Sequence, residues 1–195
     1  MYQSGIKRGI DIFLGVLLLP IFILAIIPIG IFIKREDGGN IFYNGERIGK
    51  DLKPFKMHKF RTMKMNASDI RNADGSTFNS DTDRRVTRIG HILRKTSLDE
   101  LPQIINVLKG DMSFVGPRPS PLGNINKYPD YYFKKFEIRP GITGLTQATL
   151  RNSASMEERM KLDTFYRNRV RPTMDIYIIL KTISSVLMRK NINRK

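Results

Sequence analysis

The chain has no cysteine, no tryptophan and only two histidines among its 195 residues. Without cysteine it can hold neither a disulfide scaffold nor a thiolate metal site, and no cysteine nucleophile is available. Two histidines are too few for most zinc sites. Acidic residues are scarce as well, since 18 of them stand against 34 lysines and arginines, a formal net charge of +16. A polyanionic partner is therefore expected, and nucleic acid, anionic lipid and nucleotide phosphates all fit the charge.

Charge is wholly absent from residues 12–33, and almost every side chain there is apolar. A helix of this length extends roughly 33 Å and could span a bilayer core of about 30 Å. No small-residue cleavage site follows, so the run is not a secretory signal. Asp11, just before it, is expected to form an ion pair with Lys7 or Arg8 one helical turn earlier.

The flanks of this apolar run constrain its topology. A Lys-Arg pair precedes it at residues 7–8 and another follows at residues 34–35. Such pairs tend to stay on the cytoplasmic side of a membrane. A helix that enters the bilayer, breaks near Pro20 and Pro28 and returns to the same face satisfies both flanks, because an interior proline kinks a helix. We expect this re-entrant arrangement, with a simple span and a buried core helix as the alternatives.

Two short strands are expected after the apolar run. Residues 40–49 and 54–63 each partly alternate apolar and polar side chains, and residues 49–53 make a hairpin connection between them. Lys59 lies among apolar neighbours on one face of the second strand. There it would either extend toward lipid headgroups or bind phosphate. Residues 66–85 are polar and are expected to form a loop.

An adjacent acid pair, Asp99 and Glu100, lies in the apolar setting of residues 96–103. An acid pair beside a low-dielectric surface and among cationic side chains is suited to handling a phosphorylated substrate. Ser97 and Glu100 also fit a capping box, which would make both acids ordinary first-turn residues of a helix. Pro102 would then lie inside that helix, where it is unfavourable. The helix therefore either begins after the acids or kinks at them.

Two arginines lie in rigid turns. Arg118 belongs to the Gly-Pro-Arg-Pro turn of residues 116–119, and Arg139 opens the Pro- and Gly-containing turn of residues 139–145. Proline fixes the backbone and glycine permits unusual dihedral angles, so both guanidinium groups are held on stiff platforms that suit bidentate phosphate binding. The alternative is that each arginine ties its own loop to a carbonyl or an acid.

Helices are expected over much of the remaining chain, starting with residues 88–94. Residues 128–136 mix aromatic rings with lysines, a composition typical of a membrane interface, although a core helix with a solvated lysine face has the same pattern. Ser155 and Glu158 form a capping box that opens a helix ended by Pro172. The last helix, over residues 176–187, has an apolar face that would pack on the domain or lie on the membrane.

Five motifs and the apolar run, in order along nearly the whole chain, strongly resemble the bacterial sugar transferases. More closely, they resemble the small monotopic phosphoglycosyl transferases of that superfamily. The motifs occupy residues 7–11, 59–63, 96–103, 106–119 and 139–147. The fold class expected is α+β and mostly helical: an N-terminal re-entrant membrane helix, a short β-hairpin, and interfacial amphipathic helices around a compact cytosolic domain. Residues 1–37 would form the anchor and residues 38–195 the catalytic phosphoglycosyl transferase domain.

The resemblance implies an enzyme that moves a phosphosugar from a UDP-sugar to polyprenyl (undecaprenyl) phosphate, releasing UMP and using Mg²⁺. This is the first membrane step of bacterial glycoconjugate assembly, for a capsule, O-antigen, exopolysaccharide or glycoprotein glycan. Its product would pass to downstream glycosyltransferases. The enzyme would lie monotopically on the cytoplasmic face of the cell inner membrane, in contact with anionic lipids. The resemblance names neither the sugar nor the glycan.

Site residues follow from the same resemblance. Asp99 would be the nucleophile that forms a phosphosugar-aspartyl intermediate, and Glu100, together with Asp99, would help hold Mg²⁺. The matching positions near the active site or the nucleotide phosphates are Lys59, Arg94, Arg118, Arg139 and Arg151. Two positions depart from the family pattern: Leu24 stands where the membrane helix usually has its breaking proline, and Leu150 where related sequences often have glycine. Direct transfer, with the acids acting only as base and metal ligands, stays open.

Two other classes of protein share part of this pattern. A membrane-tethered nucleic-acid binder would need a basic face with stacking aromatics or a recognition helix, and the sequence contains neither, so no nucleic acid is expected as a partner. A non-catalytic membrane scaffold would give no reason for an acid pair beside Pro102. The interfacial helices could equally form a contact between two copies, so a homodimer stays open.

Overall fold

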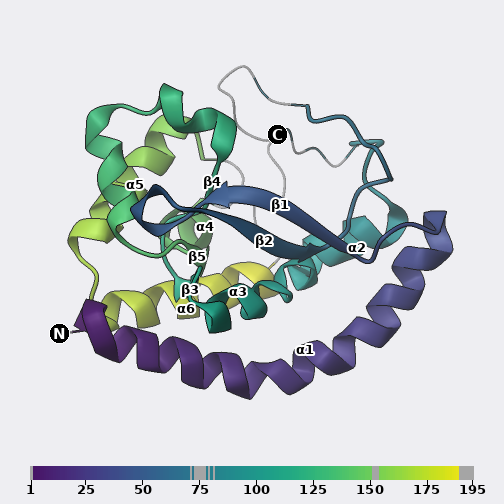
Figure 1. The fold of residues 1–195 in the computed structure, drawn as a ribbon, viewed down its shortest axis with the longest axis horizontal. Coiled ribbons are helices and arrows are strands. Elements are labelled where there is room, and N and C mark those ends of the chain that lie inside the picture. Colours follow the sequence, from purple (N-terminus) through teal and green to yellow (C-terminus); the bar gives the residue numbers. More distant parts are fainter. Residues whose placement is uncertain are drawn as a thin grey trace.

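The computed structural model describes residues 2–70, 72, 78, 80, 82–150 and 154–188. The apolar run forms most of the long helix α1 (Lys7–Asp37), which follows a π-helical turn, η1 (Tyr2–Ile6). Pro20 and Pro28 both lie inside α1, which curves along its length with its convex side away from the rest of the chain (Figure 1). The expected break at the prolines is absent: α1 is one continuous, bent helix. How it sits in a bilayer stays a prediction.

One side of α1 is apolar and exposed, and the other packs on the domain. Leu24 keeps 73% of its surface exposed, whereas Phe22 and Ile33 are buried. These two side chains share a hydrophobic cluster with Phe60, Leu93 and Ile104 of the domain. By length and composition α1 could cross a membrane. Because it also supplies part of the core, the anchor and the domain are one packing unit.

The expected hairpin is present. Strands β1 (Phe42–Ile48) and β2 (Pro54–Phe60) pair antiparallel, with Phe42 opposite Phe60, and the short 3₁₀ turn η2 (Lys50–Leu52) connects them. Strand β4 (Ser120–Pro121) adds to the other edge of β1. A separate parallel pair joins β3 (Ser113–Val115) to β5 (Gly141–Thr143). Figure 1 shows the hairpin across the middle of the molecule, on the concave side of α1.

The remaining elements are short helices. They are α2 (Arg88–Thr96), η3 (Leu98–Glu100), α3 (Gln103–Lys109), η4 (Leu122–Lys127), η5 (Asp130–Glu137), α4 (Leu145–Thr149), α5 (Met156–Asn168) and α6 (Pro172–Leu187). The capping box of Ser155 and Glu158 is confirmed, with both reciprocal hydrogen bonds present. Pro172 opens α6 as well as following α5, because a proline at the first helical position has no amide hydrogen bond to lose.

The aromatic segment 128–136 belongs to the core and does not form the predicted interfacial helix. Tyr132 and Phe136 are buried, and the segment folds as the 3₁₀ element η5. Lys135 is buried as well, because its ammonium group donates to Tyr132 Oη at 2.8 Å and lies 3.3 Å from an Asp163 carboxylate oxygen. Residues 176–187 lie within α6, where Ile178 is buried while Leu180 remains 62% exposed.

Asp11 does not pair with Lys7 or Arg8, contrary to the prediction. Its Oδ1 accepts hydrogen bonds of 3.0 Å from both the hydroxyl of Ser113 and the amide of Phe114. Lys7 binds Asp175 instead, and Arg8 donates to two backbone carbonyls of α3. These side chains do lie one helical turn apart, but residues of β3, α3 and α6 offer them closer partners. Asp11 therefore attaches α1 to the domain.

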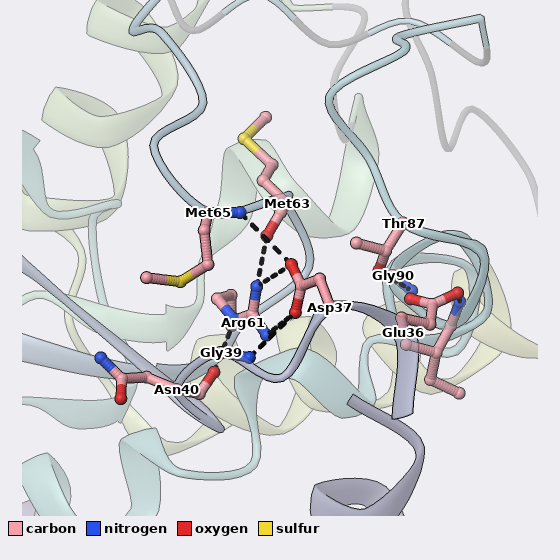
Figure 2. A network of polar contacts seen from close by, with 10 residues as sticks. Glu36, Asp37, Gly39, Asn40, Arg61, Met63, Met65, Thr87 and Gly90 are labelled. Atoms are coloured by element: carbon pink, nitrogen blue, oxygen red, sulfur yellow. Dashed lines mark hydrogen bonds and ion pairs between the residues drawn. The ribbon is translucent and has the colours of Figure 1, made fainter. Parts of the chain in front are cut away.

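The C-terminal end of α1 is held by a second polar network, shown in Figure 2. Arg61, directly after β2, donates to both carboxylate oxygens of Asp37 at 2.5 Å and to the carbonyl of Asn40. Glu36 accepts a hydrogen bond from the amide of Ile89, in the first turn of α2. A bidentate arginine–carboxylate pair fixes orientation as well as distance. The C-terminal end of α1 is thereby attached to the hairpin and to α2.

We expect Asp37→Asn to lower the free energy of unfolding by about 2–4 kcal/mol, because it leaves the buried Arg61 guanidinium without its counter-charge. The expected loss is below that for a fully buried pair since the Asp37 side chain keeps 23% of its surface exposed. Thermal unfolding in detergent measures the effect. Asp51→Asn is the control: both partners of the Lys50–Asp51 pair are largely exposed, so its effect should stay below about 0.5 kcal/mol.

Adding Arg61→Met to Asp37→Asn should recover part of the lost stability, because an apolar side chain then replaces the orphaned charge. A double variant as unstable as the sum of the two single variants would mean that the pair does not act as a unit.

Candidate active site

The acid pair lies in the 3₁₀ turn η3 between α2 and α3. Ser97 ends α2 in the left-handed region, at φ 59°, and its side chain makes no capping hydrogen bond. Helix α3 begins at Gln103, with Pro102 as its N-cap residue. The capping-box alternative is therefore wrong, and the helix begins after the acids. A left-handed serine and a proline thus confine Asp99 and Glu100 to a tight turn outside regular helix.

A lysine from the hairpin binds this turn. The Nζ atom of Lys59 lies 2.6 Å from Glu100 Oε1 and 3.8 Å from Asp99 Oδ2. Arg118 lies in the loop after β3, and its Nη1 atom is 4.0 Å from Glu100 Oε1. The Asp99 side chain is only 13% exposed. Three segments that are distant in sequence therefore bring two carboxylates and two cations into one small, partly desolvated cluster.

The two carboxyl groups differ in their affinity for a proton. Burial, reinforced by the neighbouring charge of Glu100, raises the pKa of Asp99 to about 6, against the opposing effect of Lys59. Burial also acts to raise the pKa of Glu100, but Lys59 and Arg118 outweigh it and hold that pKa below its ordinary value. Adjacent acids whose pKa values are pushed apart can take different chemical roles.

Arg94 lies on the same side of the molecule, in the last turn of α2. Its Nε donates to the hydroxyl of Thr62 at 3.0 Å. Burial lowers the pKa of Arg94, while the negative charge of Asp99 acts to raise it. Arg94 is therefore close enough to the acid pair to contribute to its field, as the resemblance implied.

The acid pair opens into a cavity of about 1200 Å³, which Lys59, Arg94 and Arg118 also line. Among the described residues, nine basic and three acidic side chains line it. Acids outside the lining neutralise three of the nine, Arg61, Arg85 and Lys135, which leaves six cations against three acids. The excess positive charge suits a ligand that carries several phosphate charges.

The cavity also has an apolar part. Leu18 of α1 lines it together with Phe42, Phe60, Leu101 and Ile104. The lining therefore runs from the membrane helix to the charged turn. A ligand that combines an apolar chain with a phosphate would find a matching surface in each part.

One predicted residue lies away from this cluster, and another is outside the described residues. Arg139 donates from Nε to the carbonyl of Gly110 at 2.8 Å and does not line the cavity, which agrees with the alternative that it braces its own loop. Arg151 lies outside the described residues.

A buried network behind Arg118 escaped the sequence analysis. Lys135 donates to the backbone carbonyl of Arg118 at 3.0 Å and pairs with Asp163. The Asp163 carboxylate also accepts hydrogen bonds from Tyr132 and Thr146. This network holds the loop that carries Arg118. Its sequence signal is a pair of adjacent lysines among aromatic residues, which also fits a solvated helix face, so the pattern alone could not identify the buried one.

The acid pair fits a magnesium ion that a substrate shares. No group of three or more histidine and acidic side chains that could hold a metal occurs in the part of the chain that the structure describes. Mg²⁺ is commonly bound by one or two carboxylates together with substrate phosphates and water. Asp99 and Glu100 supply that number of carboxylates beside a cationic cavity.

Similar sequences come from bacterial transferases. The UDP-galactose-lipid carrier transferase of Erwinia amylovora is 40% identical over 94% of this chain and 41% of its own length. The UDP-N-acetylgalactosamine-undecaprenyl-phosphate N-acetylgalactosaminephosphotransferase of Aeromonas hydrophila is 36% identical over 93% and 44%. The exopolysaccharide production protein ExoY of Sinorhizobium fredii is 37% identical over 94% and 86%. The chain thus spans about two fifths of the first two relatives and most of the third.

The family profile described as bacterial sugar transferase matches residues 2–189, which include α1, the hairpin, the acid-pair turn and the helices behind Arg118. The match covers nearly the whole chain, and the relatives agree with it over more than nine tenths of this sequence. The chain belongs to the bacterial sugar transferase family.

Proposed function

We propose that the protein transfers a sugar phosphate from a UDP-sugar to undecaprenyl or a similar polyprenyl phosphate and releases UMP. The observation that carries this proposal is the cavity, which joins a desolvated acid pair and surplus cations to an apolar surface of α1. A water-soluble diphosphate and a lipid-bound phosphate could both reach the same carboxylate there. The printed names of the Erwinia and Aeromonas relatives support a lipid-linked acceptor.

In the first half of the proposed reaction, a carboxylate oxygen of Asp99 attacks the β-phosphorus of the UDP-sugar. The bond from that phosphorus to the bridging oxygen breaks, and UMP leaves with the bridging oxygen and its electron pair. The sugar phosphate is then held on Asp99 as an acyl phosphate. Lys59 and Arg118 lie where they can stabilise the charge that develops on the phosphoryl oxygens.

In the second half, an oxygen of the polyprenyl phosphate attacks the same phosphorus, and the Asp99 carboxylate leaves. The product is a polyprenyl diphosphate that carries the sugar, and Asp99 is regenerated. Because the donor and then the acceptor react at the same carboxylate, the soluble donor and the lipid acceptor need not occupy the site together. Direct transfer would require both at once.

Asp99 and Glu100 would hold the magnesium ion together with the diphosphate. When bound, Mg²⁺ neutralises phosphate charge and so makes the diphosphate a better leaving group. Glu100 is suited to metal binding because Lys59 and Arg118 keep its pKa low and the carboxylate therefore stays ionised. Lys59 pairs with Glu100 in this structure. With Glu100 bound to a metal, the Lys59 ammonium group would be close enough to Asp99 to bind a substrate phosphate there.

For the location, we propose the cytoplasmic face of the cell inner membrane, with α1 as a re-entrant, monotopic anchor. Three observations support this topology: the exposed apolar side of α1, the basic pair at each of its ends, and its bend (Figure 1). Anionic lipids would meet the exposed Lys34–Arg35 pair, because Lys7 and Arg8 are engaged within the fold. The lipid-linked product would then serve the glycosyltransferases that extend a capsule, exopolysaccharide or related glycan.

Isotope exchange tests the covalent step. Wild-type protein given a UDP-sugar and labelled UMP, without any polyprenyl phosphate, should move label into the UDP-sugar, because the first half-reaction is reversible. Asp99→Asn should slow exchange and lipid-product formation about 10³-fold or more, since the nucleophile is lost. Asp51→Asn, an exposed carboxylate change on η2, should leave both rates unchanged. Lipid-product formation without exchange would contradict the aspartyl intermediate and favour direct transfer.

Metal removal tests the second role of the pair. EDTA should abolish product formation and added Mg²⁺ should restore it. Glu100→Gln should raise the Mg²⁺ concentration needed for half-maximal rate by about tenfold or more, because one of two carboxylate ligands loses its charge. Asp51→Asn should not change it. Full activity in EDTA would show that the acids serve the reaction without a metal.

A further inference from the structure

Helix α5 carries an arginine at the cavity that no motif identified. Arg159 lines the cavity one helical turn before Asp163. Asp163 is already engaged, since it accepts hydrogen bonds from Tyr132 at 2.7 Å and Thr146 at 3.0 Å and pairs with Lys135 at 3.3 Å. The acid one helical turn after Arg159 is therefore already paired with another cation.

Arg159 itself is incompletely satisfied. Its Nε atom is buried without a hydrogen-bond partner, and it forms no ion pair with the residues that the structure describes. Burial lowers the pKa of Arg159 and the positive charge of Arg118 lowers it further, whereas the negative charge of Asp163 acts to raise it. A buried guanidinium beside a like charge is unfavourable unless an anion joins them. An anion bound between Arg159 and Arg118 would therefore be stabilised.

The same wall contains a second unsatisfied group. The amide nitrogen and oxygen of Gln147, on α4, are both buried without a partner, and Gln147 lines the same cavity. Buried polar groups in native proteins are normally hydrogen-bonded, so exceptions at a cavity wall indicate a place for a polar ligand. Two neighbouring helices thus present unused polar groups to one cavity.

Arg118 is electrostatically close both to the acid pair and to Arg159. Arg118 contacts Glu100 at 4.0 Å and acts electrostatically on both Asp99 and Arg159. Arg159 is not among the charges that perturb either acid most strongly. A diphosphate with its β-phosphorus at Asp99 would therefore meet Arg118 first and Arg159 beyond it.

We propose that Arg159 is a donor-binding residue that, together with Arg118, clamps the diphosphate of the nucleotide sugar and contacts the α-phosphate. This inference rests on the proposed function. The α-phosphate stays with the leaving nucleotide, so Arg159 should bind UMP and UDP-sugar alike. Arg118, nearer the acids, serves the phosphate that is transferred. Arg159 then fixes the leaving group while Asp99 attacks.

Calorimetric titration of full-length protein in detergent with UMP and Mg²⁺ tests the clamp. Arg159→Met should weaken UMP binding at least tenfold, because it removes charge-assisted hydrogen bonds to phosphate. Arg159→Lys should lose less, since it keeps the charge without the planar fork. Arg167→Met is the matched control: Arg167 lies two turns further along α5, pairs with Glu137 and does not line the cavity. Its UMP affinity should change less than about twofold.

Unfolding temperature separates a binding role from a structural one. Without ligand, Arg159→Met should unfold at the same temperature as the wild type or higher, because the buried, unpaired charge is gone. UMP should raise the unfolding temperature of the wild type and of Arg167→Met, and hardly that of Arg159→Met. A lower unfolding temperature with unchanged UMP affinity would make Arg159 a structural residue and overturn the proposal.

Turnover distinguishes this inference from the proposed function. If the wild type forms lipid product and Arg159→Met retains the wild-type KM for UDP-sugar and the wild-type affinity for UMP, the clamp is wrong and the function stands. If UMP binding depends on Arg159 but no UDP-sugar is turned over, the clamp is supported and the proposed function fails.

Discussion

The contact on which the site depends is that between the Lys59 ammonium group and the two carboxylates of η3. Two adjacent acids in a poorly solvated turn repel each other, and burial alone would favour their neutral forms. Lys59 opposes both effects from a neighbouring strand, most strongly at Glu100. Its position depends in turn on the hairpin, whose last residues are held by the Arg61–Asp37 pair. A contact at the end of the membrane helix thus supports the geometry of the acids.

The cavity unites two chemical surfaces that usually occur apart. Its cationic wall combines side chains from β2, α2, α5 and the loop after β3, whereas its apolar wall includes Leu18 of α1. Each element alone has an ordinary composition. Their convergence depends on the buried Lys135–Asp163 pair, which holds the backbone of the Arg118 loop, and on the cluster that joins Phe22 to Phe60. The packing of the core therefore decides which charges meet the apolar surface.

Sequence reasoning predicted features that local rules determine. The hairpin follows from alternation, the start of α5 from a capping box, and the irregular backbone at Asp99 from Pro102. It failed where the choice of partner is made in three dimensions. Asp11 binds β3 and not the cations one turn away. The proposed binding role of Arg159 likewise depends on the pairing of Asp163 with Lys135, a contact between residues far apart in the chain.

The end of α1 has a consequence for protein engineering. A cut between residues 37 and 38 looks natural in the sequence, since it separates the apolar helix from the polar chain. In the fold, Asp37 forms an ion pair with Arg61, and Glu36 accepts a hydrogen bond from the start of α2. Phe22 and Ile33 pack in the hydrophobic core. A chimaera that exchanges the anchor at this boundary would replace one side of each contact. Chimaeras between relatives should therefore exchange α1, the hairpin and α2 together.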